Sequence, residues 1–461
     1  MKTVIKIIFT SIISAVLLCG CNNTPQTPTS SDDNSNITSY TSSQSSDISE
    51  NTSDNSVPES SSESSFSESS AESSIESSIQ ESSEISTVSE PSVNSEVSTP
   101  ESSEPTVSTP VENPSEFDFS DKYFVNKLNP KMLKNFTAAY RAVTNFESSV
   151  TFDQIITSDE LDTIMYLLNY DCPELIQISG DYYPYYTNYE TYDVSGVGFD
   201  YIMNKKEHKK AIGQLNSFFD KLKKDIGDKT ELEKEKYVYD YIFDKCVYNE
   251  TDKMSGSVYG LLIKNKGRCE AICKSFMWCM RELDVECMCV SGSQNWNDES
   301  LYASHSWNII KINGKYYHLD LTVDRICTED DNEKYPANYG FFNVNDDLIK
   351  EGREINKIFT SLGVPKCNTL KDNYHVSNGL YIDDKKQIQD AFNAVLTENF
   401  DNGFDNISIK FKYQSAYDYA QENCDSWISD FLSNISDKSF SYLYYLETLS
   451  DTITIYAEPI E

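Results

Sequence analysis

Residues 304–324 read SHSWNIIKINGKYYHLDLTVD, and this stretch decides how the rest of the chain is interpreted. It contains two runs of β-branched and aromatic residues, 305–312 and 315–321, separated by Asn313-Gly314. An Asn-Gly pair between two such runs is the strongest short signal for a two-residue hairpin loop, because both residues tolerate positive φ. We therefore predict an antiparallel hairpin that turns at Asn313 and Gly314.

The turn also fixes which residues face one another. Counting outward from it pairs Trp307 with Asp320. The same count pairs His305 with Thr322. His305 and Asp320 are then diagonal neighbours on one face of the sheet, within reach of a hydrogen bond between imidazole and carboxylate. Asp324 is the other diagonal neighbour of His305, so the register predicts a His–Asp pair without choosing between the two carboxylates.

A cysteine upstream lies where a nucleophile could be activated. Gly267-Arg268 ends a loop before Cys269, and the residues that follow are apolar at helical spacing: Ile272, Phe276, Cys279, Met280 and Leu283. At a helix N-terminus, the unpaired amides and the macrodipole favour thiolate over thiol. Taken alone, Cys269 is as well explained by a small buried residue, but the predicted His–Asp pair downstream makes it a candidate nucleophile.

The same residues resemble the motif blocks of the bacterial transglutaminase-like superfamily, in their usual order. The blocks are GRCEA at 267–271, SHSWN at 304–308 and YYHLDLTVD at 316–324, preceded by YGLL at 259–262. The resemblance covers about residues 210–330. It implies an α+β, cysteine-protease-like core with an antiparallel sheet and the nucleophile at a helix N-terminus.

The resemblance also implies roles for single residues. Cys269 is expected to be the nucleophile, His305 the general base and acid, and Asp320 the orienting carboxylate, in preference to Asp324. Neither a cofactor nor a metal ion is implied. The amide of Cys269 is the default oxyanion donor, and Tyr259 or Trp307 could support it.

Two of the motif blocks depart from the family's pattern. The family often has a small residue and an aromatic soon after the nucleophile, where this chain has Ala271-Ile272-Cys273. It also has a Pro and a Trp in the last block, where this chain has Leu321 and Val323. These positions shape the surroundings of the site, so the departures bear on the class of substrate.

The N-terminus predicts export. Lys2 and Lys6 precede an apolar run that is too short to span a bilayer, and Cys19-Gly20-Cys21 follows it. This pattern resembles a lipobox, so we expect residues 1–21 to be a lipoprotein signal peptide and Cys21 to carry the lipid. An ordinary cleaved signal is the alternative. The protein is then expected at the extracellular side of the cell membrane, held there only by its lipid.

Residues 22–115 are rich in Ser, Glu, Thr and Pro and contain no Lys or Arg. Such a segment has too little apolar surface to offset the entropy of ordering, so we predict a disordered linker. The net charge of −36 argues against nucleic acid as a partner. The expected partner is a protein or peptide substrate at the cell surface or outside the cell.

The remaining chain is expected to form three parts: an N-terminal helical and β subdomain at 116–209, the transglutaminase-like core at 210–365, and a small α+β domain at 366–461. A tyrosine-dense stretch, 182–192, has two interpretations: a twisted β-hairpin, which we favour, or a stacking platform for sugar or peptide.

Most cysteines after the signal peptide are expected to be small core residues, and Cys287 and Cys289 are poorly placed to bond to each other.

Three functions remain open. The first is acyl transfer from an amide through a thioester at Cys269, ending in hydrolysis or in transfer to an amine. The second is a non-catalytic surface module that retains the fold. The third is a metal site formed by Cys269, Cys273, Cys279 and His305, which is the weakest because no compact CxxC pair exists.

Overall fold

The computed structural model describes residues 5–8, 117–295, 302–326, 329–330, 333–334, 337–350, 352–400, 404–435 and 438–460. All of these residues belong to one compact unit of the chain. Cys21 and the predicted linker lie outside the described residues. Among the residues that are described, no helix is both long and apolar enough to cross a membrane.

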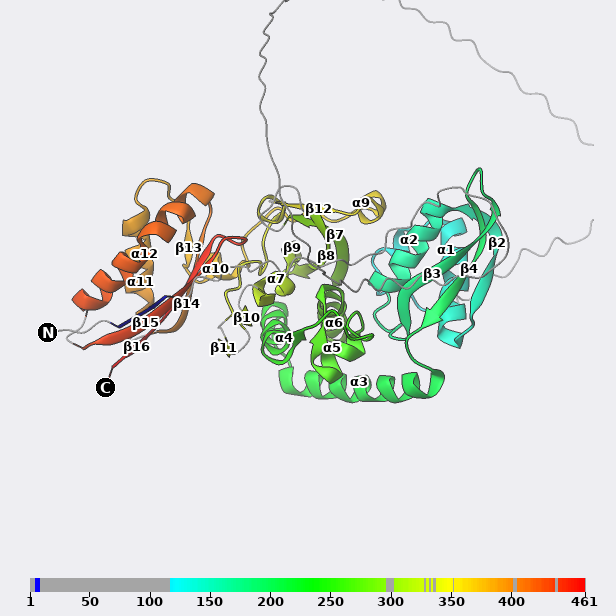
Figure 1. The fold of residues 1–461 in the computed structure, drawn as a ribbon, viewed down its shortest axis with the longest axis horizontal. Helices are drawn as coiled ribbons and strands as arrows, with labels where there is room; N and C mark the ends of the chain where they lie inside the picture. Colours follow the sequence, from blue (N-terminus) through cyan, green and yellow to red (C-terminus); the bar gives the residue numbers. More distant parts are fainter. Residues whose placement is uncertain are drawn as a thin grey trace, which may run out of the picture. The chain divides into compact units, whose positions relative to one another are not determined.

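The first part combines two helices with a three-stranded sheet (Figure 1). Its elements are a 3-10 turn at Val125–Lys127, α1 (Pro130–Asn145), β2 (Ser149–Thr157), α2 (Ser158–Tyr170), β3 (Ile178–Asn188) and β4 (Asp193–Tyr201). The sheet order is β2-β4-β3. Local signals set the helix starts: Asn129 caps α1 with Pro130 next to it, and Thr157 forms a capping box with Glu160 at α2.

The tyrosine-dense stretch forms a β-hairpin, which confirms the favoured structural interpretation. In β3, Tyr183 and Tyr185 are exposed, while Tyr182 and Tyr186 are partly buried against the core. This alternation is what a strand with one covered face produces. The exposed tyrosines lie opposite two residues of β4, Gly198 and Gly196.

The second part contains the site. Its first elements are α3 (Lys205–Ile226), α4 (Glu231–Lys245), β5 (Val247–Tyr248), α5 (Val258–Lys264), β6 (Lys266–Gly267) and α6 (Cys269–Glu282). A four-stranded antiparallel sheet follows, in the order β12-β7-β8-β9, from β7 (Cys287–Asn295), β8 (Tyr302–Ile312), β9 (Lys315–Leu319) and β12 (Arg353–Ile355). Helix α6 packs against β7 and β8. Smaller elements complete this part: α7 (Leu321–Ile326), β10 (Glu329–Asp330), β11 (Glu333–Lys334), α8 (Asp346–Ile349), α9 (Lys357–Leu362) and α10 (Tyr374–Ser377).

The hairpin register is confirmed, but the second strand is shorter than expected. Asn308 pairs with Leu319, as the turn predicts, and Asn313 and Gly314 have φ of 50° and 72°. Strand β9 then ends at Leu319, so the predicted pairing of His305 with Thr322 does not form. The cause is a long-range contact, because the amide of Asp320 donates to the carbonyl of Phe341 and the chain turns into α7.

The third part is an α+β arrangement, as the sequence predicts. It contains β13 (Tyr381–Ile382), α11 (Ile388–Asn399), β14 (Phe404–Phe411), α12 (Gln414–Ile435), β15 (Phe440–Glu447) and β16 (Thr452–Pro459). Its sheet has the order β1-β15-β16-β14-β13, with β1 (Ile5–Ile8) parallel to β15. Residues 5–8 fall within the predicted signal peptide, so this pairing belongs to the uncleaved chain.

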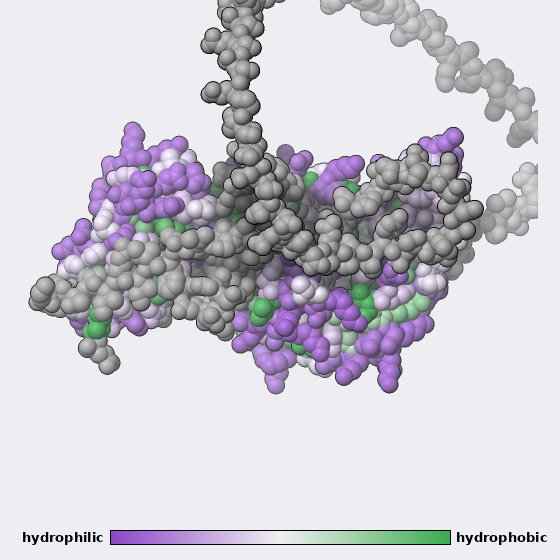
Figure 2. All heavy atoms as spheres, viewed as in Figure 1, coloured by the Kyte–Doolittle hydropathy of each residue, from purple (hydrophilic) through white to green (hydrophobic). Residues whose placement is uncertain are grey.

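The buried apolar residues form two clusters. One runs from Phe119 to Cys367, so the predicted parts 116–209 and 210–365 share a core. The other runs from Leu380 to Ala457 and belongs to the third part. On the face shown in Figure 2, hydrophilic side chains cover most of the described surface, with small hydrophobic patches between them.

The cysteines are mainly core residues, as expected. Seven described cysteines are buried thiols outside any disulfide: Cys172, Cys246, Cys269, Cys279, Cys287, Cys367 and Cys424. One disulfide joins Cys273 of α6 to Cys289 of β7, with Cα atoms 5.8 Å apart. Cys287 and Cys289 do not bond to each other, in agreement with their spacing along one strand.

Candidate active site

Cys269 is the first residue of α6 and is fully buried. The chain reaches it through β6, whose last residue, Gly267, lies against two helices. A Cβ atom at Gly267 would come within 2.8 Å of the Ala271 side chain and 2.9 Å of the Leu261 side chain. A glycine is therefore required for the chain to enter α6 so close to α5. Arg268 occupies the N-cap position without a side-chain cap bond.

Two cations hold the first turn of α6 through a buried carboxylate. Glu270 accepts hydrogen bonds from Arg268 and Lys274, each at 2.7 Å. Lys274 also donates to Asn169 of α2 at 3.0 Å. Burial raises the pKa of Glu270, but Lys274 and Arg268 outweigh it and lower the pKa to about 2. The residue after Cys269 is therefore an anchored anion, which fixes the backbone at the helix start.

His305 and Asp320 lie side by side in the sheet. Nε2 of His305 is 2.8 Å from Oδ2 of Asp320, and both side chains are fully buried. Burial raises the pKa of Asp320, but His305 and Arg353 lower it to below its usual value, so the carboxylate is ionised. An ionised carboxylate only accepts hydrogen bonds, which places a proton on Nε2. Nδ1 is then the ring nitrogen that can take a proton from a thiol.

The other candidate carboxylate, Asp324, is directed elsewhere. It accepts a hydrogen bond from the hydroxyl of Tyr239 at 2.8 Å and one from the amide of Phe341 at 3.1 Å. Burial raises its pKa to about 7. The structure thus places Asp320 beside His305, and the turn of the chain into α7 carries Asp324 toward α4.

The two predicted oxyanion supports have other partners. The hydroxyl of Tyr259 donates to Gln214 of α3 at 3.0 Å. Nε1 of Trp307 donates to Nδ1 of His318 at 3.2 Å. Tyr259 and Trp307 each have a single polar hydrogen, and the hydrogen bonds to Gln214 and His318 occupy it. Neither side chain is therefore placed to donate to an oxyanion in this arrangement. Trp307 contacts the site differently, because its ring stacks on His305 with centroids 6.0 Å apart.

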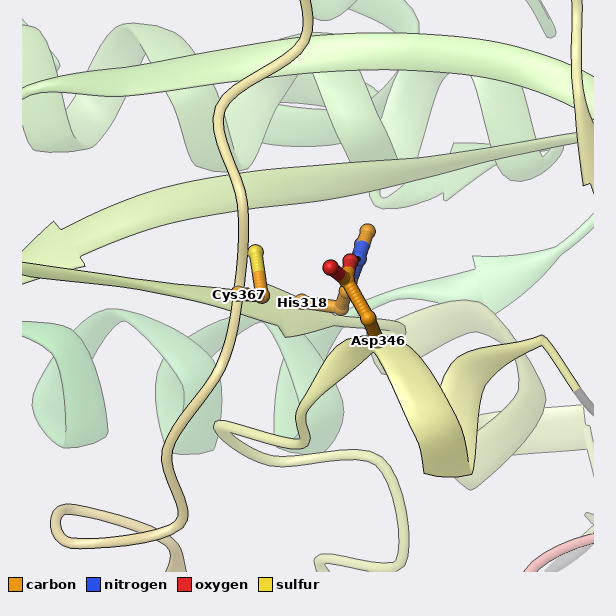
Figure 3. A group of neighbouring side chains, drawn as sticks. All are labelled: His318, Asp346 and Cys367. Carbon is orange, nitrogen blue, oxygen red and sulfur yellow. Dashed lines mark hydrogen bonds and ion pairs between the residues drawn. The ribbon is translucent and has the colours of Figure 1, made fainter.

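A second group of possible ligands lies near Trp307. Figure 3 shows His318 of β9, Asp346 of α8 and Cys367 close together, and their ligand atoms lie within 4.8 Å of one another. Nδ1 of His318 accepts from Trp307, and burial lowers the pKa of His318 in spite of Asp346. The proton of the neutral ring therefore lies on Nε2, 3.0 Å from Asp346. A metal ion would need the lone pair of that nitrogen, so the residues do not fit one.

The predicted metal site also fails. It requires Cys273 as a thiolate ligand, but Cys273 is in the disulfide with Cys289. A disulfide sulfur is not the thiolate that binds zinc.

One buried residue of the site was missed by the sequence argument. Nη2 of Arg353 donates to Oδ2 of Asp320 at 2.8 Å, and Nε of Arg353 donates to Gln294. Arg353 lies in a charged loop sequence, EGREINK at 351–357, which has no pattern typical of a site. Arg353 reaches Asp320 because β12 pairs with β7.

Comparison with known proteins gives one family. Residues 220–321 match the transglutaminase-like superfamily. One similar solved structure is described as the crystal structure of a TGase (10% identity, TM-score 0.22, 38% of this chain and 50% of that chain). Another is a candidate cysteine protease from Cytophaga hutchinsonii (10% identity, TM-score 0.21, 38% of this chain and 67% of that chain). The chain thus spans half the length of the first structure. No curated protein sequence matches it.

The matched residues run from the end of α3 to the start of α7. They contain α6, with Cys269 at its first position, and the β8–β9 hairpin with His305 and Asp320 at its open end. The three motif blocks of the sequence all begin inside this range. The chain therefore carries a transglutaminase-like domain, of mixed helix and strand, centred on residues 220–321.

Proposed function

We propose that this protein is an exported, lipid-anchored cysteine enzyme that acts on protein or peptide amides through a thioester intermediate. The observation that carries the proposal is the 2.8 Å contact between His305 and Asp320 on the sheet against which α6 packs. Cys269 begins that helix, where the backbone amides and the dipole favour a thiolate.

The proposed reaction follows from the position of the proton on the ring of His305. His305 takes the thiol proton of Cys269 on Nδ1, and the imidazolium is stabilised by the ionised Asp320. The thiolate attacks the amide carbonyl and forms a C–S bond. The C–N bond then breaks, and His305 returns the proton to the leaving amine. Water or a second amine attacks the thioester, which regenerates the thiol and gives a hydrolysed or a transferred product.

The location of the enzyme rests on its N-terminus. A lipid at Cys21 would hold the chain at the extracellular side of the membrane, and residues 22–115 would act as a tether. Residues 22–115 are rich in carboxylates, whose mutual repulsion would favour an extended tether. Substrates within its reach are proteins of the cell surface, wall peptides and proteins outside the cell.

The first test uses a small alkylating reagent and needs no substrate. The rate of iodoacetamide reaction at Cys269 is measured against pH in the wild-type chain and in His305→Ala. Trypsin cleaves after Arg268 and Lys274, so Cys269 is recovered in a short peptide whose other cysteine, Cys273, is in a disulfide. We expect a midpoint well below the ~8.5 of a free thiol in the wild type only.

The internal control is another buried thiol of the same helix. Burial raises the pKa of Cys279 well above its usual value, so its alkylation reports general unfolding. A Cys269 that reacts in parallel with Cys279, or with the profile of an ordinary thiol in both proteins, contradicts the enzyme proposal.

A second function has one observation in its favour. Cys269 and His305 are both fully buried, so neither reacting atom lies at the surface. A non-catalytic surface module that retains the fold would have this property. Under that alternative, Cys269→Ala has no effect on the cellular phenotype, whereas truncation after residue 365 abolishes binding to the partner.

A further inference from the structure

Arg353 makes an almost wholly buried ion pair with Asp320. Its side chain is 1% exposed, and that of Asp320 is fully buried. The two residues are far apart in sequence and meet only because β12 pairs with β7, with Arg353 opposite Gln294. Gly352 precedes it with φ of 74°, a conformation that favours glycine, and accepts a hydrogen bond from the amide of Asn295. The backbone therefore delivers Arg353 to one defined position.

The guanidinium is fixed on several sides. Its Nε donates to the side-chain oxygen of Gln294, and its Nη2 donates to Asp320. Its central carbon lies 4.1 Å from the ring centre of Phe341 and 5.9 Å from that of Trp307. Arginine suits this place because its planar fork can donate in two directions while it stacks on aromatic rings. A flexible lysine offers only one point charge.

Arg353 and His305 share one acceptor. Nη2 of Arg353 and Nε2 of His305 each lie 2.8 Å from Oδ2 of Asp320, so these two nitrogens are at most 5.6 Å apart, twice 2.8 Å. The other oxygen, Oδ1, accepts from the amide of Val323 at 3.2 Å. The carboxylate cannot rotate without breaking several hydrogen bonds. A fixed cation thus lies within range to repel a proton on His305.

We propose that Arg353 is a positioning residue that holds Asp320 ionised and oriented toward His305, and that its charge limits how tightly His305 retains its proton. The inference rests on the proposed function for its catalytic meaning. Two effects follow. Asp320 stays a pure acceptor, which keeps the proton of neutral His305 on Nε2 and leaves Nδ1 as the base. The positive charge of Arg353 also opposes the positive charge of the imidazolium, which favours transfer of the proton to a leaving amine.

The test follows His305 itself. The full-length chain is labelled with 13C in its histidine rings, and the pH titration of each ring is recorded by NMR. The chain has four histidines, and His305→Ala assigns the signal. Arg353→Gln removes the neighbouring charge, so the midpoint of the His305 titration should rise by roughly one pH unit. Arg353→Lys retains the charge but loses the fork that fixes its position, so its midpoint should lie between those of the wild type and Arg353→Gln.

Lys350→Gln provides the matched control. It removes one positive charge from the same segment, but Lys350 is 65% exposed and its nearest carboxylate oxygen is 4.0 Å away. The midpoint of His305 should stay unchanged in this variant. If Arg353 acted in folding alone, its replacement would lower the stability of the protein without moving the titration of His305 in the folded state. Equal His305 midpoints in the wild type, Arg353→Gln and Lys350→Gln therefore overturn the proposal.

If Arg353→Gln does not fold, Gln294→Leu takes its place. This change retains the charge and removes the second anchor of the guanidinium, so a smaller upward shift is expected, and an unchanged midpoint overturns the proposal. The test is separate from that of the enzyme. If Cys269 behaves as an ordinary thiol while the His305 midpoint rises in Arg353→Gln, the proposed function fails and the positioning of Asp320 by Arg353 stands.

Discussion

Asp171 joins three segments of the chain, and its replacement by Asn should be strongly destabilising. Asp171 follows the last residue of α2 and is fully buried. Its Oδ2 accepts from the amides of Phe124 and Val125, at 2.9 and 3.0 Å. Its Oδ1 accepts from Arg281 of α6 at 2.6 Å, and its backbone carbonyl accepts from the same guanidinium at 2.9 Å. Both oxygens are therefore used.

Asparagine has the same shape but only one acceptor oxygen. The side-chain NH2 of the asparagine would face either the two backbone N–H groups or the guanidinium of Arg281. In both orientations two hydrogen-bond donors would point at each other. The Arg281 side chain is 8% exposed, and its other carboxylate neighbour, Asp121, is 4.0 Å away and half exposed. Breaking a buried ion pair by removing one charge costs about 3–5 kcal/mol. The free energy of unfolding should fall by that amount in Asp171→Asn.

Urea unfolding at neutral pH, followed by tryptophan fluorescence, measures the loss. Asp153→Asn is the matched control, because Asp153 pairs with Lys134 at 2.8 Å but both side chains are more than half exposed. Exposed pairs contribute little, so the control should leave the urea midpoint unchanged. If the two substitutions shift the midpoint equally, the argument that burial makes the Asp171 pair important is refuted.

Two further predictions concern other buried polar groups. Burial raises the pKa of Asp324 to about 7, so its effect on stability is favourable at low pH and is lost as the pH rises through 7. Asp324→Asn should therefore gain stability over the wild type between pH 5 and pH 8, and an equal difference in urea midpoint at both values contradicts this. The cluster of His318, Asp346 and Cys367 should bind no stoichiometric zinc, because the bond from Trp307 leaves the proton of His318 on the nitrogen that a metal would need. Metal analysis of the purified protein and an unchanged melting temperature in EDTA check this, and one tightly bound zinc per chain would refute the tautomer argument.

The elements that the sequence predicts well are those set by neighbouring residues. Asn313-Gly314 determines the hairpin register, because the geometry of a two-residue turn leaves one alignment. Helix α2 begins at Ser158, directly after Thr157, because Thr157 and Glu160 form a local capping box. In each case the information lies within a few positions of the residue concerned.

The features that were missed depend on distant segments. The end of β9 is decided by Phe341, whose carbonyl takes the amide of Asp320. The hydroxyl of Tyr259 is directed to α3 by Gln214, and no local pattern indicates that bond. Arg353 enters the site through strand pairing across a gap of 33 positions from Asp320. A single sequence contains no signal for such contacts, because each depends on how separate elements pack.

The disulfide between Cys273 and Cys289 restricts how α6 and the sheet can move relative to each other. It lies one helical turn after Cys269 and joins α6 directly to β7, the strand beside β8. The helix and the sheet therefore cannot slide apart or hinge at this point while the disulfide is intact. Cys269 is fully buried, so under the proposed function access to it would require a change elsewhere than at this link between α6 and β7. The disulfide thus keeps the start of α6 in register with the strands that carry His305 even if other segments move.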